Sequence, residues 1–416
     1  MTPEVKKRIE QIRQGIVPEG YVKDKDGIYP RDWASKKIGQ WLKLAERPIV
    51  LQDEEEYQLV TVRRGFGGVD SRGSFLGKNV LVKNYFIVKT GDFIISKRQI
   101  AHGACGIVPP ELDGAVVSNE YNVFLPQDGT NIQMFNLMMQ LPHYKRLFYL
   151  MSDGVHIEKL LFKTQDWMKR KLAMPLLKEQ KKIAEILATQ DKAIKLQGRK
   201  IEELKRFKQG CLERMFPRKG QKVPEKRFPG FTDDWEQRKL NAVVSRESAT
   251  KISSAEFPSV EYEDVISEEG HLNKDIYQKE PGKNGIAFDG SQVLYGKLRP
   301  YLHNWLNPDF KGVAVGDWWV MKPIDADKNF LYRLIQTPQF DNVSNQSSGS
   351  KMPRADWNLV SNTEFMIPYS KVEQHKIGEY FSSLDHLITL HQRKLEEMKK
   401  QKKALMQLLL TGIVRV

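Results

Sequence analysis

The chain is poor in cysteine and lacks long apolar runs. Cys105 and Cys211 are the only two cysteines among 416 residues, and neither belongs to a CxxC pair. This usage argues against a cysteine-based metal site and for a reducing compartment. No apolar stretch approaches the roughly 18 to 20 residues that span a bilayer, and the N-terminal MTPEVKKRIEQIRQG has no apolar segment typical of a secretory signal. We therefore expect a cytoplasmic protein.

Catalytic motifs are lacking as well. The segment 307–310 (NPDF) is similar to the Asn-Pro-Pro-Tyr/Phe loop of amino-methyltransferases, but its second proline is missing and no FxGxG turn precedes it. The glycine-rich segment 63–73 lacks the GxxxxGK[ST] spacing of a phosphate-binding loop. His102 and Cys105 have no second pair to complete four metal ligands. We interpret the chain as non-catalytic, with no cofactor or metal of its own.

The positive charge of the chain is unevenly distributed. The formal net charge is +14, which suggests a polyanionic partner such as nucleic acid. Residues 178–218 hold twelve Lys and Arg against six Asp and Glu, and residues 371–416 hold nine against five, so these two segments carry +10 of the total. Lysine-rich helix faces are often merely solvated, so charge alone does not establish DNA binding.

The same two segments are predicted to be long helices with matching heptad seams. Aligned at an offset of 194 residues, 179–216 and 373–410 share 14 identities in 38 positions, where ordinary composition would give roughly two. Apolar residues recur at alternating steps of three and four, as a coiled coil requires. The seam positions that we expect on these helices are Ile183, Leu187, Ile194, Ile201 and Leu204 in the first, and Ile377, Phe381, Ile388, Leu395 and Met398 in the second.

The repeat extends beyond the helices, so the chain is an internal duplication. YPRDWASKKI (29–38) lies opposite FTDDWEQRKL (231–240), and GDFIISKR (91–98) lies opposite GSQVLYGKLR (290–299). The middle of each copy has short Val, Ile and aromatic runs between Gly, Asn and Asp, which is typical of β-structure. We predict an α+β fold: two β-rich globules separated by two long antiparallel coiled-coil helices, related by an internal pseudo-twofold repeat.

The diverged globules offer side chains suited to reading DNA. Such reading needs Arg, Lys or small polar groups at base edges and further cations at phosphates. Each candidate is individually more often an ordinary surface residue, and the cations after one shared strand could equally fix a turn of the common frame. The candidates are Arg63, Arg64, Arg72, Lys78, Lys97 and Arg98 in the first copy, and Lys297, Arg299, Ser350, Lys351 and Arg354 in the second.

Several motifs, in this order and twice over, resemble the specificity (S) subunit of type I restriction–modification systems. They are RFPGFTDDWEQRKL (227–240), YGKLRP (295–300), SGSKMPRADW (348–357) and the Pro followed by Glu-Gln that opens each long helix. The resemblance spans essentially the whole chain. It departs at the first copy, which opens with MTPEVKKRIEQIRQGIVPEGY and lacks the RFPGF form, so its globule could be of another recognition subtype.

The resemblance implies a target recognition domain in 1–172, a central conserved helix in 173–218, a second recognition domain in 219–365 and a C-terminal conserved helix in 366–416. It implies that each recognition domain reads half of a bipartite double-stranded DNA target, while the helices form a spacer and dock two modification (M) subunits. S-adenosylmethionine, ATP and Mg²⁺ would be bound by M and restriction (R) subunits. No membrane contact is expected.

Two other classes of function remain open from the residues. A self-contained DNA-modifying enzyme would need a cofactor loop or metal cluster that the chain lacks. A coiled-coil adaptor without DNA sequence specificity is the stronger alternative, but a scaffold has no reason to carry two different globule surfaces on one repeated frame.

Overall fold

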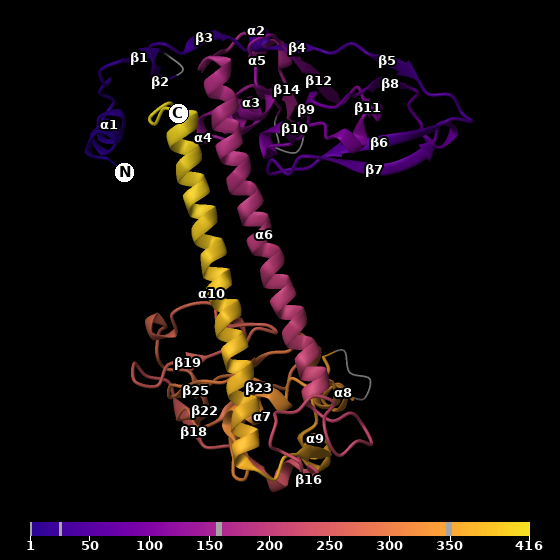
Figure 1. The fold of residues 1–416 in the computed structure, drawn as a ribbon, viewed down its shortest axis with the longest axis vertical. Helices are drawn as coiled ribbons and strands as arrows, with labels where there is room; N and C mark the ends of the chain where they lie inside the picture. The colour runs from indigo at the N-terminus through magenta and orange to yellow at the C-terminus, as the bar shows by residue number, and fades with distance from the viewer. Residues whose placement is uncertain (1, 25–26, 155–159, 347–351) are drawn as a thin grey trace. The chain divides into compact units, whose positions relative to one another are not determined.

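The computed structural model describes residues 2–24, 27–154, 160–346 and 352–416. The chain forms two compact units, one made of Met1–Leu196 with Glu396–Val416 and the other of Gln197–Leu395. The helices α6 (Leu177–Met215) and α10 (Lys371–Leu410) each contribute one half to either unit (Figure 1). The predicted long helices are confirmed, and α6 begins six residues before the first seam position at Ile183.

The first unit contains two main sheets. One has the strand order β10-β9-β12-β4 and the other β5-β8-β11-β6-β7. Their strands are β4 (Leu42–Leu44), β5 (Pro48–Val50), β6 (Glu56–Val62), β7 (Val69–Leu76), β8 (Asn84–Ile87), β9 (Phe93–Ser96), β10 (Cys105–Ile107), β11 (Val116–Ser118) and β12 (Tyr121–Pro126).

Shorter elements complete the first unit. The two-stranded pairs are β1 (Tyr21–Asp24) with β2 (Gly27–Pro30), β3 (Ala34–Lys37) with β15 (Lys171–Met174), and β13 (Ser152–Asp153) with β14 (Leu161–Phe162). The helices are α1 (Pro3–Arg13), α2 (Ile38–Trp41), α3 (Ile132–Met139), α4 (Pro142–Leu150) and α5 (Thr164–Met168).

The second unit repeats the two main sheets of this plan, apart from β7. Its sheets have the orders β24-β23-β26-β17 and β18-β22-β25-β19, with the pairs β16–β27 and β20–β21. The strands are β16 (Glu236–Lys239), β17 (Val244–Glu247), β18 (Thr250–Ile252), β19 (Ser259–Val260), β20 (Val265–Ile266), β21 (His271–Leu272), β22 (Asn284–Phe288), β23 (Val293–Gly296), β24 (Trp305–Leu306), β25 (Gly312–Ala314), β26 (Trp318–Pro323) and β27 (Glu364–Ile367). The helices are α7 (Lys328–Leu334), α8 (Pro338–Ser344) and α9 (Trp357–Asn362).

The matching strand orders confirm the internal duplication. In both units the second sheet contains one parallel pair, β6 with β11 and β19 with β25, inside an otherwise antiparallel arrangement. The strand after the aromatic opener pairs in both units with the strand before the long helix, β3 with β15 and β16 with β27. The first unit adds β7, whereas the corresponding sheet of the second unit ends at β19 among the described residues.

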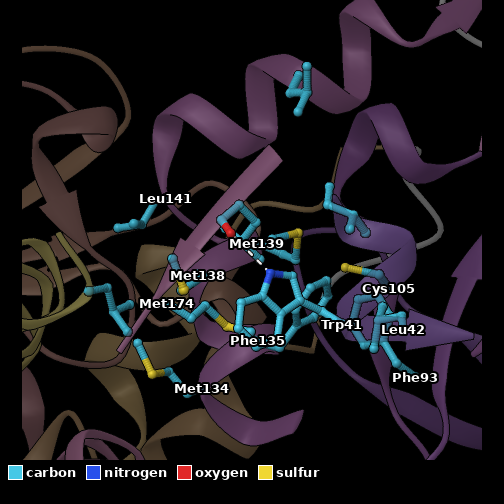
Figure 2. Packing of buried hydrophobic residues seen from close by; sticks show 14 of the residues in the cluster. Trp41, Leu42, Phe93, Cys105, Met134, Phe135, Met138, Met139, Leu141 and Met174 are labelled. Carbon is cyan, nitrogen blue, oxygen red and sulfur yellow. Dashed lines mark hydrogen bonds between the residues drawn. The ribbon is translucent and has the colours of Figure 1, made fainter. Parts of the chain in front are cut away.

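Each unit buries its half-helices in the core of its own globule. In the first unit Ile183 and Leu187 pack with Leu409 and with the aromatic cluster around Trp167. Figure 2 shows the sulfur-rich part of this core, where Trp41 lies among several methionine side chains. The Trp41 indole nitrogen donates to the carbonyl oxygen of Leu172 at 3.0 Å, so the buried polar group is satisfied.

The two long helices run antiparallel within each unit. In the first unit Lys402 on α10 forms an ion pair with Asp191 on α6. In the second unit the equivalent positions exchange helices, and Lys208 on α6 contacts Asp385 on α10 at 2.7 Å. Each pair is the image of the other at the offset of 194, so the same contact occurs twice with the helix roles reversed.

The glutamine of the Glu-Gln pair at the start of each long helix makes the same two hydrogen bonds in both units. Gln180 is fully buried; its oxygen accepts from the Asn131 backbone N–H at 2.7 Å and its nitrogen donates to the Pro175 carbonyl at 2.8 Å. Gln374 repeats both contacts with the Asp327 N–H and the Pro368 carbonyl. The side chain therefore ties the start of the long helix to the N-cap of a globule helix.

The preceding glutamates hold an arginine from a distant part of the chain. In the second unit Glu373 accepts a bidentate pair from Arg227 at 2.7 and 2.8 Å and a third hydrogen bond from the Trp235 indole. In the first unit Glu179 is held by Arg415, which also binds Asp32. Arg227 belongs to the RFPGF segment, which the first copy lacks. In the first unit Arg415 makes the equivalent contact with the glutamate.

We predict that Glu373→Gln lowers the free energy of unfolding by about 3–5 kcal/mol, because it removes one partner of a buried, hydrogen-bonded ion pair. Urea titration followed by circular dichroism measures the loss. The matched control is Glu379→Gln, since the Glu379 side chain is 63% exposed and is paired with the exposed His375. Equal losses for the two variants would contradict a special role of the buried pair.

Candidate nucleic-acid interface

The segment after β9 and the segment after β23 are built by the same backbone hydrogen bonds. The Lys97 N–H donates to the Glu120 carbonyl, and the Lys97 carbonyl accepts from the Phe162 N–H at 3.0 Å. Lys297 repeats this arrangement with the carbonyl of Asp317 and the N–H of Ala355. These lysines are therefore backbone junctions of the shared frame, which joins three chain segments at one point in each globule.

An acidic residue at each junction neutralises nearby cations. Arg98 donates to the Glu120 carboxylate at 2.6 Å in the first unit. In the second unit Asp317 accepts from Arg354 at 3.0 Å and lies 3.5 Å from the Lys297 ammonium. Three of the predicted DNA-binding cations are thus engaged in ion pairs with the residue that precedes β12 or β26.

The other predicted cations of the first unit lie on the β6–β7 hairpin and the turn that follows it. Arg63 is paired with Asp70, and Lys78 lies 3.4 Å from Glu54. Arg64 has an interaction of its own. Arg72 is exposed at a β-bulge, because Leu59 is paired with Gly73 and the next residue of β6 is paired with Ser71.

The tip of this hairpin is fixed against the junction. Phe66 has a left-handed φ of 60°, and its N–H donates to the carbonyl of Gly103 at 2.8 Å. Gly65 donates to the carbonyl of His102 at 2.7 Å. The basic hairpin tip of the first unit therefore packs beside the turn that follows Lys97 and Arg98. Ser350 and Lys351, two further candidates, lie outside the described residues.

The seam residues of the long helices are engaged inside their own units. Ile183, Leu187, Ile201, Ile377, Phe381 and Ile388 are buried, and Ile194, Leu204, Leu395 and Met398 are half-buried. Large apolar side chains that remain exposed on these helices are Phe207 and Leu390, at 52% and 46%, together with Leu196, Leu387 and, in the first turn of α10, Val372. A partner subunit would therefore meet these exposed side chains and not the seam.

A cavity of about 620 Å³ lies in the second unit between its helix segments and its globule. Its charged lining groups neutralise one another: Lys205 pairs with Glu269, and Lys208 with Asp385. Burial lowers the pKa of Lys208, while the charge of Asp385 acts in the opposite direction. The cavity therefore lacks the excess of cations that a nucleic-acid site requires.

Neither a cluster of metal ligands nor a membrane-spanning helix occurs among the described residues. Within the described ranges no three His, Cys, Asp or Glu side chains come together in a way that could hold a metal ion. Burial raises the pKa of the Cys105 thiol, which accords with a packing role in the core. The described helices include none that is long and apolar enough to cross a bilayer.

Sequence reasoning missed the residues that hold the frame together. The partners of the surface cations, Glu120 and Asp317, were not singled out, although an acidic residue precedes the same strand in both copies. Arg227 and Arg415 were missed too. The sequence does not show that these two arginines are equivalent, because they follow α6 and α10 at different distances. Only the fold brings them to the equivalent glutamates Glu373 and Glu179.

The fold and the surface define a duplicated protein with two β-rich globules on one repeated helical frame. The chain belongs to the family described as "Type I restriction modification DNA specificity domain", whose model matches residues 30–206 and 232–400. The two matches fall on the two copies of the repeat, and together they cover well over half of the chain.

Curated relatives include two proteins of Methanocaldococcus jannaschii. The type I restriction enzyme MjaVIII specificity subunit is 24% identical over 93% of this chain and 94% of its own length. The putative type I restriction enzyme MjaX specificity subunit is 21% identical over 96% of this chain and 97% of its own length.

Two solved structures share the fold. A chain from a structure of the type I R-M system superimposes with a TM-score of 0.58 at 16% identity, covering 93% of this chain and 99% of that chain. The S subunit of a type I restriction-modification system from M. genitalium gives 0.55 at 13% identity, covering 91% and 96%. The predicted α+β fold with its pseudo-twofold repeat is confirmed.

We predict that Asp317→Asn destabilises the second unit in a pH-dependent way. Burial alone would raise the pKa of Asp317, but the hydrogen bond and charge of Arg354, followed by those of Lys297, outweigh it and lower the pKa below the usual 3.8. A depressed folded-state pKa stabilises the fold above the unfolded-state value, and this contribution is lost as pH falls through the folded value.

The difference in unfolding free energy between the parent protein and Asp317→Asn should therefore be constant near neutral pH and shrink below about pH 4. Denaturant titrations at a series of pH values measure it. Asp289→Asn is a suitable comparison, because Ser291 rather than a cation is the main cause of the lowered pKa of Asp289. A difference that grows on acidification would contradict the assignment.

Proposed function

We propose that this chain is the sequence-specific DNA-binding specificity subunit of a type I restriction–modification complex. Each globule reads one block of a bipartite target in double-stranded DNA, and partner subunits methylate adenine or cleave. The observation that carries the proposal is the pair of family matches on two copies whose frames agree and whose globule surfaces differ. A repeated frame with two different surfaces fits two different half-sites.

The chemistry is assigned to the partners. We propose that S-adenosylmethionine is bound by M subunits and that ATP and Mg²⁺ act with R subunits, leaving this chain to select the site. Its own contribution is recognition and positioning, which rigid strands and pinned turns supply well. A subunit that selects sites on chromosomal DNA works where the chromosome is, so we place it in the cytoplasm.

The long helices are the proposed docking elements for two M subunits. Leu196 and Leu390 occupy equivalent positions at the offset of 194, and both are exposed, at 53% and 46%. A large apolar side chain kept exposed at the same place in both copies favours a binding surface for a partner that is present twice. Phe207 extends this surface in the second unit, where it is 52% exposed.

We predict that Phe207→Asp together with Leu390→Asp weakens M-subunit binding at least tenfold, because a partner would have to bury two carboxylates. Native mass spectrometry or co-purification of the tagged complex measures the occupancy. The matched control is Leu81→Asp, which changes a fully exposed leucine of the β7–β8 connection. Unchanged assembly of the double variant would contradict docking at this surface.

The function itself is tested by sequencing the methylated sites of a cell that expresses this chain with its M partner, against a deletion strain. We expect a new methylated motif of two short blocks around a fixed unspecified gap. Replacing residues 226–360 with the corresponding domain of another such subunit should change one block only. An assembled complex that leaves methylation unchanged would instead favour the adaptor without sequence specificity.

A further inference from the structure

The turn after β9 and the turn after β23 place one residue of each globule in the same structural position. A 3-10 helix follows in both units, Ile100–His102 and Pro300–Leu302, and the residue that caps its N-terminus is Gln99 in the first and Arg299 in the second. Both 3-10 helices end in a left-handed residue, Gly103 with φ 77° and His303 with φ 52°. We call the position occupied by Gln99 and Arg299 the reading position.

The backbone hydrogen bonds around the reading position are equivalent. The Ser96 N–H donates to the Ala104 carbonyl at 3.0 Å, and the Gly296 N–H donates to the Asn304 carbonyl at 2.7 Å. With the junction contacts of Lys97 and Lys297, these bonds fix both ends of the turn. The two copies thus share the hydrogen bonds that bound the turn, whereas the capping residue differs in side chain and in backbone: Gln99 has φ −117° and ψ 4°, and Arg299 has φ 49° and ψ 65°.

Arg299 is held in a backbone conformation that costs free energy in a residue with a side chain. Its φ is 49° and its ψ is 65°, a region that non-glycine residues rarely adopt. The Arg299 N–H donates to the Pro353 carbonyl at 2.8 Å, and the neighbouring Leu298 N–H donates to the Tyr262 hydroxyl oxygen at 2.9 Å. Strain that the surroundings maintain in this way is typical of functional positions.

The guanidinium of Arg299 is exposed, and within the described ranges it takes part in no ion pair or side-chain hydrogen bond. The neighbouring cations Arg354 and Lys297 are instead paired with the Asp317 carboxylate. The structure therefore neutralises the cations around Arg299 and leaves Arg299 itself available to a ligand.

Gln99 is also incompletely used. It is half-buried, and its side-chain oxygen is a buried acceptor without a hydrogen-bond partner among the described residues. Its backbone is occupied, since its carbonyl accepts from the N–H groups of His102 and Ala104. A buried acceptor left without a donor is costly, so the amide of Gln99 gains a hydrogen bond if its side chain turns outward to a bound partner.

We propose that the reading position supplies a base-specific contact in each globule: Arg299 to guanine and Gln99 to adenine in the major groove. Arginine forms two parallel hydrogen bonds to guanine O6 and N7, and glutamine donates to adenine N7 while accepting from its N6 amino group. The free guanidinium and the unpartnered amide oxygen are the groups that these two contacts require. The proposal rests on the proposed function and names which residues carry its specificity.

The test exchanges the two side chains in the complex with M subunits and sequences the methylated sites. Arg299→Gln should change one position of one block, reducing the preference for guanine there by roughly 5- to 150-fold, and leave the other block intact. Gln99→Arg should change one position of the other block, from adenine towards guanine. The two effects should combine independently in the double variant.

Two further variants separate reading from folding. Arg299→Gly relieves the left-handed strain, so its melting temperature should equal or exceed that of the parent while selectivity at the same position is lost. Arg238→Gln, which changes an arginine of the same unit that is paired with Asp325 and is not a DNA-binding candidate, should leave the motif unchanged.

The proposal is overturned if assembled complexes of Arg299→Gln and Arg299→Gly methylate the parental motif with the parental preference at every position. It is also overturned if Gln99→Arg and Arg299→Gln alter the same block. A parent complex that yields no bipartite motif would refute the proposed function itself, which distinguishes that failure from failure of the reading position.

Discussion

The antiparallel pairing of α6 and α10 is the constraint on which the rest of the structure depends. Gln197 and His391 occupy equivalent positions of the two copies, and they contact each other: the Gln197 nitrogen lies 2.8 Å from the His391 ring nitrogen and 2.8 Å from its carbonyl oxygen. Residues 197 and 391 are equivalent in the repeat, so this contact aligns the two helices at matching positions of their seams. The polar pair therefore fixes the register of the antiparallel helix segments within the second unit.

Polar groups in an apolar seam specify register at some cost in stability. The Gln197–His391 pair is accompanied by Lys402 with Asp191 in the first unit and Lys208 with Asp385 in the second, and each of these ion pairs is the repeat image of the other. A shift by one heptad would separate all three pairs at once. Each globule then packs on a defined segment of each helix, and these helix segments hold its β-strands and turns in place.

Much of this could be predicted from the sequence, because the evidence is periodic. The heptad seams, the duplication and the β-rich character of the globules follow from residue spacing, and even the matching of Gln197 with His391 was visible. Their mutual contact was not, since the predicted antiparallel arrangement leaves the register of the two helices open. The surface cations were found as a class, but whether Arg98 and Lys297 are neutralised depends on Glu120 and Asp317, about 20 residues further along the chain. The equivalence of Gln99 and Arg299 depends on backbone hydrogen bonds between distant segments, which residue spacing does not reveal.

The most direct test of the central claim is to place cysteines at the two contacting positions, Gln197→Cys with His391→Cys, in a chain whose Cys105 and Cys211 are replaced by serine. A short bifunctional thiol reagent should then bridge 197 and 391 within one chain, giving a faster-migrating product that methylates the parental motif with its M partner. No bridge in this chain, with efficient bridging in a second chain that combines Gln197→Cys with a cysteine near the start of α10, would show that the helices do not pair in this antiparallel register and would contradict the account.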